Sequence, residues 1–547
     1  MLLESLTIEN FRAIRSMELP LDDTVVLIGE NGCGKTSIFD ALHACLGIRN
    51  NSGPALLFHR HDFRPLPGLS GGEPVEPIRI VLRFVEREPG ECGKPSGCCL
   101  SAALLGGEDE KRGLVWEVRA GWDEASQAAE VNWGFLDAGG RALKLADGEA
   151  LVKELRRRCP FLLFGQSDRH TLTVDEPEFE RAERFLERSG IAGTEMEETT
   201  RELYAKLSEG WENLSQKDMR KARTAAKRIW RKLVHPKEAR WRTASRNRSF
   251  HLPSGGAQSL GPLIVFGSLL RARGARPLDP DVDPVFGTEH LDAFLHPSTM
   301  GSVWQVLDSL PVQKLIVTYS GDLVSSIPLA SLRRIVRRRR GTDVHSFNPS
   351  HVGKDELRRL GYHIRSRRGG ALFDRTWLLV EGETEFWLLP EMARLAGYEF
   401  EAEGIGVVEF AQCGLRPIIK LARELGISWH LLADGDDAGS RYAETAAAFL
   451  DGAASGDHIT QLPDGDMESY LWTAGYANVY RKASRAGGKR RHGSRDRNAT
   501  VARAINTNSK PFLALSVIEA CAEEDSPGIP PLIRSVIDAT IRLARTN

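Results

Sequence analysis

The chain has 547 residues, and we expect two or three domains because single cores rarely grow beyond about 250–300 residues. Its 73 lysines and arginines nearly balance its 74 aspartates and glutamates, so net charge does not indicate a nucleic-acid partner. No run reaches the roughly 20 apolar residues that span a bilayer, and the N-terminus lacks a signal-peptide core, so we expect no association with a membrane. The eight scattered cysteines favour a reducing compartment, and we expect a cytoplasmic protein.

A nucleotide-binding loop is predicted near the N-terminus. The apolar run 25–28 leads into Gly-Glu-Asn-Gly-Cys-Gly-Lys-Thr at 29–36, and a helical pattern follows. This is the strand, loop and helix order that the phosphate-loop motif requires, and its glycines let backbone N–H groups surround phosphates. Lys35 would reach the β- and γ-phosphates of ATP, and the Thr36 hydroxyl would bind Mg²⁺. The expected nucleotide contacts in the loop are Asn31, Gly32, Gly34, Lys35, Thr36 and Ser37.

This loop and the segment 6–14, Leu-Thr-Ile-Glu-Asn-Phe-Arg-Ala-Ile, resemble the N-terminus of chromosome-maintenance ABC ATPases such as the RecF and SMC proteins. Ser-Gly-Gly-Ala-Gln at 254–258 resembles the signature of that family. The resemblance implies that Ser254 and Gly256 contact the γ-phosphate held by a second subunit, at a helix N-terminus. As a bare sequence, the same residues would also fit a glycine-rich turn.

Residues 175–250 are predicted to be helical, with an acidic first half and a basic second half. Between 217 and 248 there are thirteen lysines and arginines and two acids. The basic half either binds the phosphate backbone of DNA or forms a solvated face paired with the acidic half, and the sequence favours neither reading.

The next motif matches the ABC ATPase family less well than the phosphate loop does. The run 285–297 resembles the family's acidic segment that ends in Leu-His-Pro. That alignment places Glu289 beside Mg²⁺ and His290 where the water-polarising glutamate is expected. Pro280 and Pro284 interrupt the apolar strand before it, which a central strand tolerates badly, so a loop is the alternative.

A second departure follows the apolar run 315–317. Tyr319 stands there at the position of the family's switch histidine. A tyrosine is not a general base near neutral pH without help, and the neutral His290 carries no negative charge for the attacking water. Asp292 or Glu289 could serve as the base instead, and the sequence favours neither of them. We therefore expect ATP to bind but to be hydrolysed slowly.

Two acidic clusters in the C-terminal third each follow a short apolar run. The run 378–380 leads into Glu-Gly-Glu-Thr-Glu, and the run 431–433 leads into Asp-Gly-Asp-Asp. Both runs read as buried parallel strands, whose carboxyl ends meet at one edge of a sheet. Carboxylates converging there call for Mg²⁺ or Mn²⁺, which prefer oxygen ligands. The pattern resembles a Toprim domain; two acidic surface turns are the alternative.

An ABC-type head followed by a Toprim domain resembles the OLD (overcoming lysogenisation defect) family of ATP-dependent endonucleases over nearly the whole chain. The resemblance implies an α/β protein, with an ABC-type ATPase head, a helical dimerisation insert and a Toprim domain with a parallel sheet. It places the head at 1–169 and 241–368, the insert at 170–240 and the Toprim domain at 369–547. It also implies a homodimer with a role in phage defence or DNA processing.

The same resemblance assigns five acidic residues to two metal ions about 4 Å apart. Glu381, Asp434 and Asp436 would hold one ion. Glu385 and Glu468 would hold the other, and Glu468 belongs to an acidic stretch that resembles a helix-opening segment of the family.

Lys510 stands in a Lys-Pro pair that also resembles the family, and it would stabilise charge on the scissile phosphate. Lys489 is a competing candidate, and an ordinary solvated lysine is the alternative. The expected function is hydrolysis of DNA phosphodiesters with Mg²⁺ or Mn²⁺, controlled by ATP. A nucleotide-dependent DNA-binding scaffold with an inactive Toprim site is the alternative function. A topoisomerase-like role is less favoured, because no type II topoisomerase motif accompanies the acids.

Overall fold

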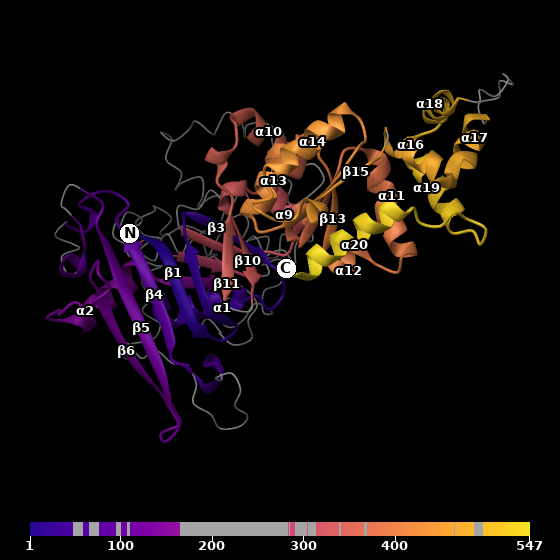
Figure 1. Ribbon diagram of the computed structural model, residues 1–547. Helices are drawn as coiled ribbons and strands as arrows, with labels where there is room; N and C mark the ends of the chain where they lie inside the picture. Colours follow the sequence, from indigo (N-terminus) through magenta and orange to yellow (C-terminus); the bar gives the residue numbers. More distant parts are fainter. Residues whose placement is uncertain are drawn as a thin grey trace, which may run out of the picture. The chain divides into compact units, whose positions relative to one another are not determined.

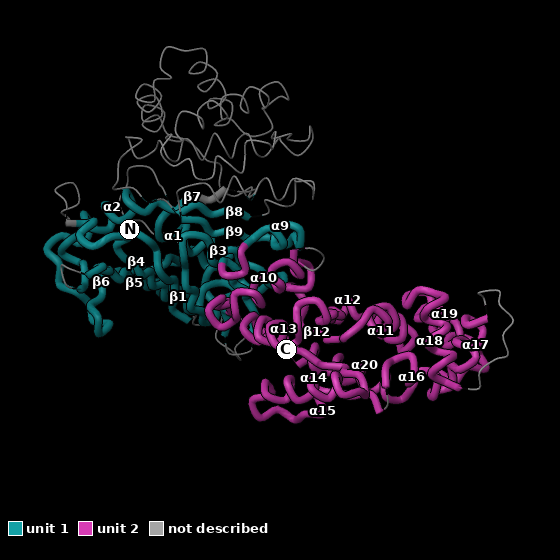
Figure 2. The backbone as a smooth tube through the Cα atoms, turned by 90° about the horizontal axis from the view of Figure 1, so that it is seen from above, with its two compact units in different colours: residues 1–327, 331–344 teal, residues 328–330, 345–547 magenta. Residues whose placement is uncertain are grey.

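A computed structural model describes residues 1–47, 58–64, 76–93, 100–106, 110–164, 283, 285–289, 304, 313–338, 341–365, 369–463, 465–485 and 496–546. The chain forms two compact units, which Figure 2 distinguishes by colour. The first comprises residues 1–327 and 331–344, and the second comprises residues 328–330 and 345–547. The predicted dimerisation insert at 170–240 lies outside the described residues, and the predicted domain boundaries remain predictions.

The first unit contains two sheets (Figure 1). One is antiparallel in the order β2-β1-β4-β5-β6. Its strands are β1 (Leu2–Phe11), β2 (Ile14–Pro20), β4 (Ile78–Val85), β5 (Gly113–Asp123) and β6 (Ala128–Leu136). Buried residues alternate along β4, because one face of this sheet packs on the core.

The other sheet of the first unit has the order β11-β10-β3-β9-β8-β7. Its strands are β3 (Thr24–Gly29), β7 (Phe161–Phe164), β8 (Val285–Thr288), β9 (Gln313–Val317), β10 (Leu332–Arg337) and β11 (Thr342–Ser346). β3 runs parallel to β9 and β10, and β8 runs parallel to β7 and β9. Within its described residues, this unit has the α-helices α1 (Lys35–Leu46), α2 (Gly148–Arg158) and α9 (Gly321–Ser326).

The strand before Glu289 is intact, which corrects the prediction that prolines interrupt it. All four residues of β8 are buried, between two parallel neighbours. The strand begins directly after Pro284, so neither proline removes an N–H group from its ladder. The alternative of a loop at this position is therefore wrong.

The second unit is built on a parallel sheet in the order β13-β12-β14-β15. Its strands are β12 (Thr376–Val380), β13 (Ile405–Glu409), β14 (Ser428–Ala433) and β15 (Ile459–Gln461). Helices α13 (Leu415–Glu424) and α14 (Asp437–Ala447) pack together against β14, and α11 (Glu383–Leu395) and α20 (Pro531–Thr546) also pack together and contact the sheet. All five residues of β12 are buried, as expected of a parallel strand covered on both faces.

The second unit has further helices among its described residues, and several of them lie toward the C-terminus (Figure 1). They are α10 (Lys354–His363), α12 (Phe400–Glu403), α15 (Ser455–His458), α16 (Met467–Leu471), α17 (Ala477–Arg485), α18 (Arg497–Thr507) and α19 (Lys510–Cys521). The predicted α/β class and the parallel C-terminal sheet are confirmed. Among the described residues, no helix is long and apolar enough to cross a bilayer.

Candidate functional site

The phosphate loop connects the central strand β3 to α1, as the sequence predicts. Gly29 has a φ of 147°, and a Cβ atom there would lie 2.4 Å from the carbonyl oxygen of Ile335 on β10. Gly34 has a φ of 105°, and its Cβ would lie 2.7 Å from Cγ1 of Ile14 on β2. Only glycine fits both positions, so the loop stays close to the neighbouring strands.

Lys35 is almost fully buried, with 3% of its surface exposed, and its ammonium group contacts the loop itself. Its Nζ donates to the carbonyl oxygens of Gly29 at 2.8 Å and Glu30 at 2.6 Å, and lies 3.4 Å from Cys33 Sγ. The ring centroid of Tyr319 is 4.6 Å from the same atom. An ammonium has three N–H donors, so a bound triphosphate must replace some of these contacts.

Glu289 and Tyr319 both lie beside Lys35. Glu289 directly follows β8, and Tyr319 follows β9 by two residues. Burial lowers the pKa of Lys35, while the Cys33 thiol and the carboxylates of Glu289 and Glu30 oppose that shift. Of the other predicted contacts, Asn31, Gly32 and Thr36 are exposed on the loop and Gly34 and Ser37 are buried. Ser254, Gly256 and His290 lie outside the described residues.

Glu381 and Asp434 leave the parallel sheet of the second unit at the same edge. Glu381 directly follows β12, Asp434 directly follows β14, and these two strands are adjacent and parallel. Asp436 caps α14 by accepting a hydrogen bond from the Gly439 N–H at 2.7 Å. A Cβ atom on Gly439 would lie 2.0 Å from the carbonyl oxygen of Asp434, so glycine lets α14 begin against the strand end.

Two further predicted acids come from helices. Glu385 in the first turn of α11 is 5% exposed, and Glu468 in α16 is 2% exposed. The Thr384 hydroxyl donates to Oε1 of Glu468 at 2.8 Å. The ammonium of Lys510, the first residue of α19, lies 3.6 Å from the same oxygen. Lys489, the competing lysine, lies outside the described residues.

These side chains form one electrostatically coupled cluster. Burial and the charges of four carboxylates raise the pKa of Asp434 to about 8. The four carboxylates are those of Glu385, Glu381, Asp466 and Asp436. Burial, with Glu468 contributing, raises the pKa of Glu385 to about 7, while Lys510 opposes the rise. Carboxyl groups that keep protons near neutral pH show that the ammonium of Lys510 does not balance the negative charge of the cluster.

Asp466 belongs to this cluster, although the sequence reasoning did not select it. It caps α16 by accepting a hydrogen bond from the Ser469 N–H at 2.8 Å, as Asp436 caps α14. The Gly435 N–H donates to the Gly465 carbonyl oxygen at 2.6 Å, which joins the two turns that carry these aspartates. Both turns read Asp-Gly-Asp, and this repeated tripeptide was the signal that could have identified Asp466.

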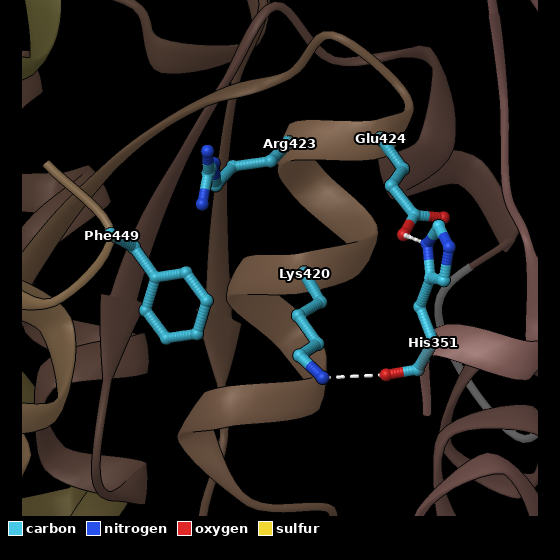
Figure 3. Close-up of a pocket in the computed structure, with 5 residues that line it drawn as sticks. All are labelled: His351, Lys420, Arg423, Glu424 and Phe449. Carbon is cyan, nitrogen blue, oxygen red and sulfur yellow. Dashed lines mark hydrogen bonds and ion pairs between the residues drawn. The ribbon is translucent and has the colours of Figure 1, made fainter. Parts of the chain in front are cut away.

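A pocket lined by His351, Lys420, Arg423, Glu424 and Phe449 lies elsewhere in the second unit (Figure 3). Glu424 Oε1 is 2.7 Å from His351 Nδ1, and Lys420 donates to the His351 carbonyl oxygen at 2.5 Å. Three of the five residues lie near the end of α13. A helix that follows a parallel strand ends at the opposite edge of the sheet, so this pocket is separate from the acidic cluster.

Comparison with known proteins gives two family models that together match residues 1–436. Residues 1–371 match the family model "Protein of unknown function (DUF2813)", and residues 372–436 match "Overcoming lysogenization defect protein-like, TOPRIM domain". Protein YbjD of Escherichia coli (strain K12) is 31% identical over 580 aligned positions, which cover 100% of this chain and 99% of that protein. The DNA replication and repair protein RecF of Rickettsia felis is 54% identical over 41 residues, 7% of this chain and 11% of that protein.

Two solved structures resemble parts of the chain at low similarity. The C-terminal region of the Xanthomonas campestris pv. campestris OLD protein has a TM-score of 0.27 and 16% identity, covering 32% of this chain and 95% of that one. The SMC head domain from Thermotoga maritima has a TM-score of 0.33 and 14% identity, covering 64% and 100%. The assignment rests on the sequence matches: the chain belongs to the DUF2813 family and carries an OLD-like Toprim domain, as the resemblance to the OLD family implies.

Proposed function

We propose that the protein is an ATP-regulated DNA endonuclease that depends on Mg²⁺ or Mn²⁺. The observation that carries this proposal is the carboxylate cluster at the carboxyl edge of the parallel sheet, in which Glu385 and Glu468 are buried, in a chain that matches an OLD-like Toprim domain. Carboxylates that are grouped in this number and partly buried repel one another, and protons or cations that neutralise them relieve the repulsion. The carboxyl edge is also where open α/β sheets bind ligands.

The cluster has the chemistry that divalent cations require. Its donors are oxygens, which suit Mg²⁺ and Mn²⁺, and Oε2 of Glu381 is buried without a hydrogen-bond partner among the described residues. As the side chains stand, no three His, Cys, Asp or Glu residues in the described ranges have the geometry to hold an ion, so binding requires side-chain rotation. We assign Glu381, Asp434 and Asp436 to one ion, and Glu385 and Glu468 to the other.

Two bound ions would activate water and stabilise the leaving 3′ oxygen of a phosphodiester. The ammonium of Lys510 places a positive charge beside the carboxylate cluster. Burial lowers its pKa, but Glu468 and Glu385 raise it, and the net shift is upward. Its side chain is 43% exposed, so the ammonium is accessible to a phosphate from solvent while it contacts Glu468. We assign Lys510 to stabilising charge on the scissile phosphate.

We assign the phosphate loop to ATP and expect ATP to act mainly as a regulatory ligand. Lys35 would reach the phosphates by exchanging its contacts with the carbonyl oxygens of Gly29 and Glu30, and the exposed Thr36 is available to Mg²⁺. In a homodimer, Ser254 and Gly256 of a second copy would cover the γ-phosphate. Tyr319 beside Lys35 supplies no anionic base, which supports slow hydrolysis.

The test is nicking of supercoiled plasmid DNA by the full-length protein, with and without Mn²⁺ and ATP. Glu381→Ala and Asp434→Ala should each reduce nicking by about 10²-fold or more, because the ligands of the ions are lost. Asp437→Ala is the matched control, since Asp437 is an exposed carboxylate in the first turn of α14. Full activity in both cluster variants would contradict the proposal, and ATP-dependent DNA binding without cleavage would support the scaffold alternative.

A further inference from the structure

The ammonium group of Lys35 is engaged by its own loop and by one aromatic ring. Its Nζ donates to the carbonyl oxygens of Gly29 and Glu30 at 2.8 Å and 2.6 Å, and lies 3.4 Å from Cys33 Sγ. These three partners match the three N–H donors of an ammonium. The ring of Tyr319 lies against the same group, with its centroid 4.6 Å from Nζ. Lys35 cannot keep all of these contacts and also pair with the β- and γ-phosphates of ATP.

The fold holds the backbone of Tyr319 beside the phosphate loop. The adjacent strands β3 and β9 are parallel, and Leu27 pairs with Val317. Gly29 and Tyr319 each follow that pair by two residues, so they stand at the same level of the sheet. On the other side of Tyr319, the Ser320 side chain caps the N-terminus of α9. The ring therefore approaches Lys35 from a backbone that a strand and a helix both fix.

The side chain of Tyr319 is free to move in a way that the side chain of Lys35 is not. Tyr319 is 40% exposed, whereas Lys35 is 3% exposed. An exposed side chain changes its rotamer quickly, so the ring can turn into solvent without opening the core. The contact itself is favourable, because the face of an aromatic ring attracts a cation, most strongly where the cation is withdrawn from water. The ring therefore stabilises the ammonium in its position on the loop carbonyls.

We propose that the ring of Tyr319 competes with the phosphates of ATP for the ammonium of Lys35, and so lowers the affinity of the loop for ATP. This inference rests on the proposed binding of ATP. Tyr319 is then a positioning residue, because it acts on the nucleotide through Lys35. The apparent affinity of a ligand falls with the population of the position that can bind it. A contact between a cation and an aromatic ring changes such a population by about 3- to 30-fold.

Three single variants separate the effect of the ring from other effects of the substitution. Tyr319→Ala removes the ring, whereas Tyr319→Phe keeps the ring and removes only the hydroxyl. Tyr362 on α10 is another exposed tyrosine, with 70% of its surface exposed, and it belongs to the second unit. Tyr362→Ala therefore controls for the loss of an exposed aromatic side chain that does not contact Lys35.

A first measurement tests the contact itself, in full-length protein without nucleotide. Wild type, Tyr319→Ala, Lys35→Met and the double variant form a double-mutant cycle, in which Lys35→Met removes the ammonium and keeps an apolar stem. Tyr319→Ala should lower the melting temperature in the wild-type background and change it much less in the Lys35→Met background, because the ring then has no cation to stabilise. Additive effects of the two substitutions on the melting temperature would overturn the inference.

The deciding measurement is titration calorimetry of the full-length variants with a non-hydrolysable ATP analogue and Mg²⁺. Tyr319→Ala should bind the analogue about 3- to 30-fold more tightly than wild type, and Tyr319→Phe and Tyr362→Ala should bind it with wild-type affinity. Equal or weaker binding by Tyr319→Ala, or tighter binding by Tyr319→Phe, would overturn the inference alone. Absence of binding by wild type and by both Tyr319 variants would overturn the proposed binding of ATP together with it.

Discussion

Removing one charge from the acidic cluster should stabilise the metal-free protein at alkaline pH. Asp434 has a pKa raised from 3.8 to about 8 by burial and by its carboxylate neighbours. Because the folded state binds this proton more tightly than the unfolded chain, the stabilisation is fully present below about pH 4 and is lost as the pH rises through about 8. Asp434→Asn removes this titration and relieves the repulsion on Glu385 and Glu381.

The magnitude follows from the size of the shift. Between pH 5 and pH 8 the unfolded chain has released the Asp434 proton while the folded protein largely keeps it. Those roughly 3 pH units correspond to about 4 kcal/mol at about 1.4 kcal/mol per unit. Asp434 is partly exposed, and solvent screening reduces the expected loss to about 2 kcal/mol. Between pH 5 and pH 8, the free energy of unfolding of the wild type should therefore fall by about 2 kcal/mol relative to that of Asp434→Asn.

The assay is urea unfolding of both proteins in EDTA at pH 5 and pH 8, with Asp437→Asn as the exposed control. The difference between wild type and Asp434→Asn should change by about 2 kcal/mol between the two pH values, and the control should follow wild type. Saturating Mn²⁺ should then stabilise wild type at pH 8 far more than Asp434→Asn, because the ion replaces the missing positive charge. Parallel pH dependence of wild type and Asp434→Asn would refute the coupling of these carboxylates.

Three further outcomes are expected. Lys35→Ala should lose ATP affinity in calorimetry, because the cation that pairs with the β- and γ-phosphates is gone; equal binding would count against the loop. Steady-state phosphate release should stay well below the ~10 s⁻¹ typical of enzymes. Turnover of that size, lost in Glu289→Gln but kept in His290→Ala, would show that the carboxylate of Glu289 acts on the attacking water. Gly439→Ala should lower the free energy of unfolding by about 1–3 kcal/mol, since its Cβ would lie 2.0 Å from the Asp434 carbonyl oxygen, and denaturant titration measures the loss.

The elements whose signals are local could be predicted from the amino-acid sequence. The phosphate loop was readable because a strand, a glycine-rich loop and a helix follow one another within about 20 residues. Glu381 and Asp434 were readable because each directly follows an apolar run, and parallel strands end at one edge of a sheet. The prolines before β8 misled the reasoning, because a strand that starts after a proline loses no ladder hydrogen bond.

Which groups distant in the sequence share an environment became known only from the folded chain. Lys35 is held by its own loop and by the ring of Tyr319, which no spacing in the sequence could indicate. Asp466 joins the acidic cluster because the Gly435 N–H donates to the Gly465 carbonyl oxygen and so holds the two Asp-Gly-Asp turns together. Electrostatic coupling and hydrogen-bond satisfaction depend on distance in space and on burial, and the chain sets both only when its helices pack against the sheet.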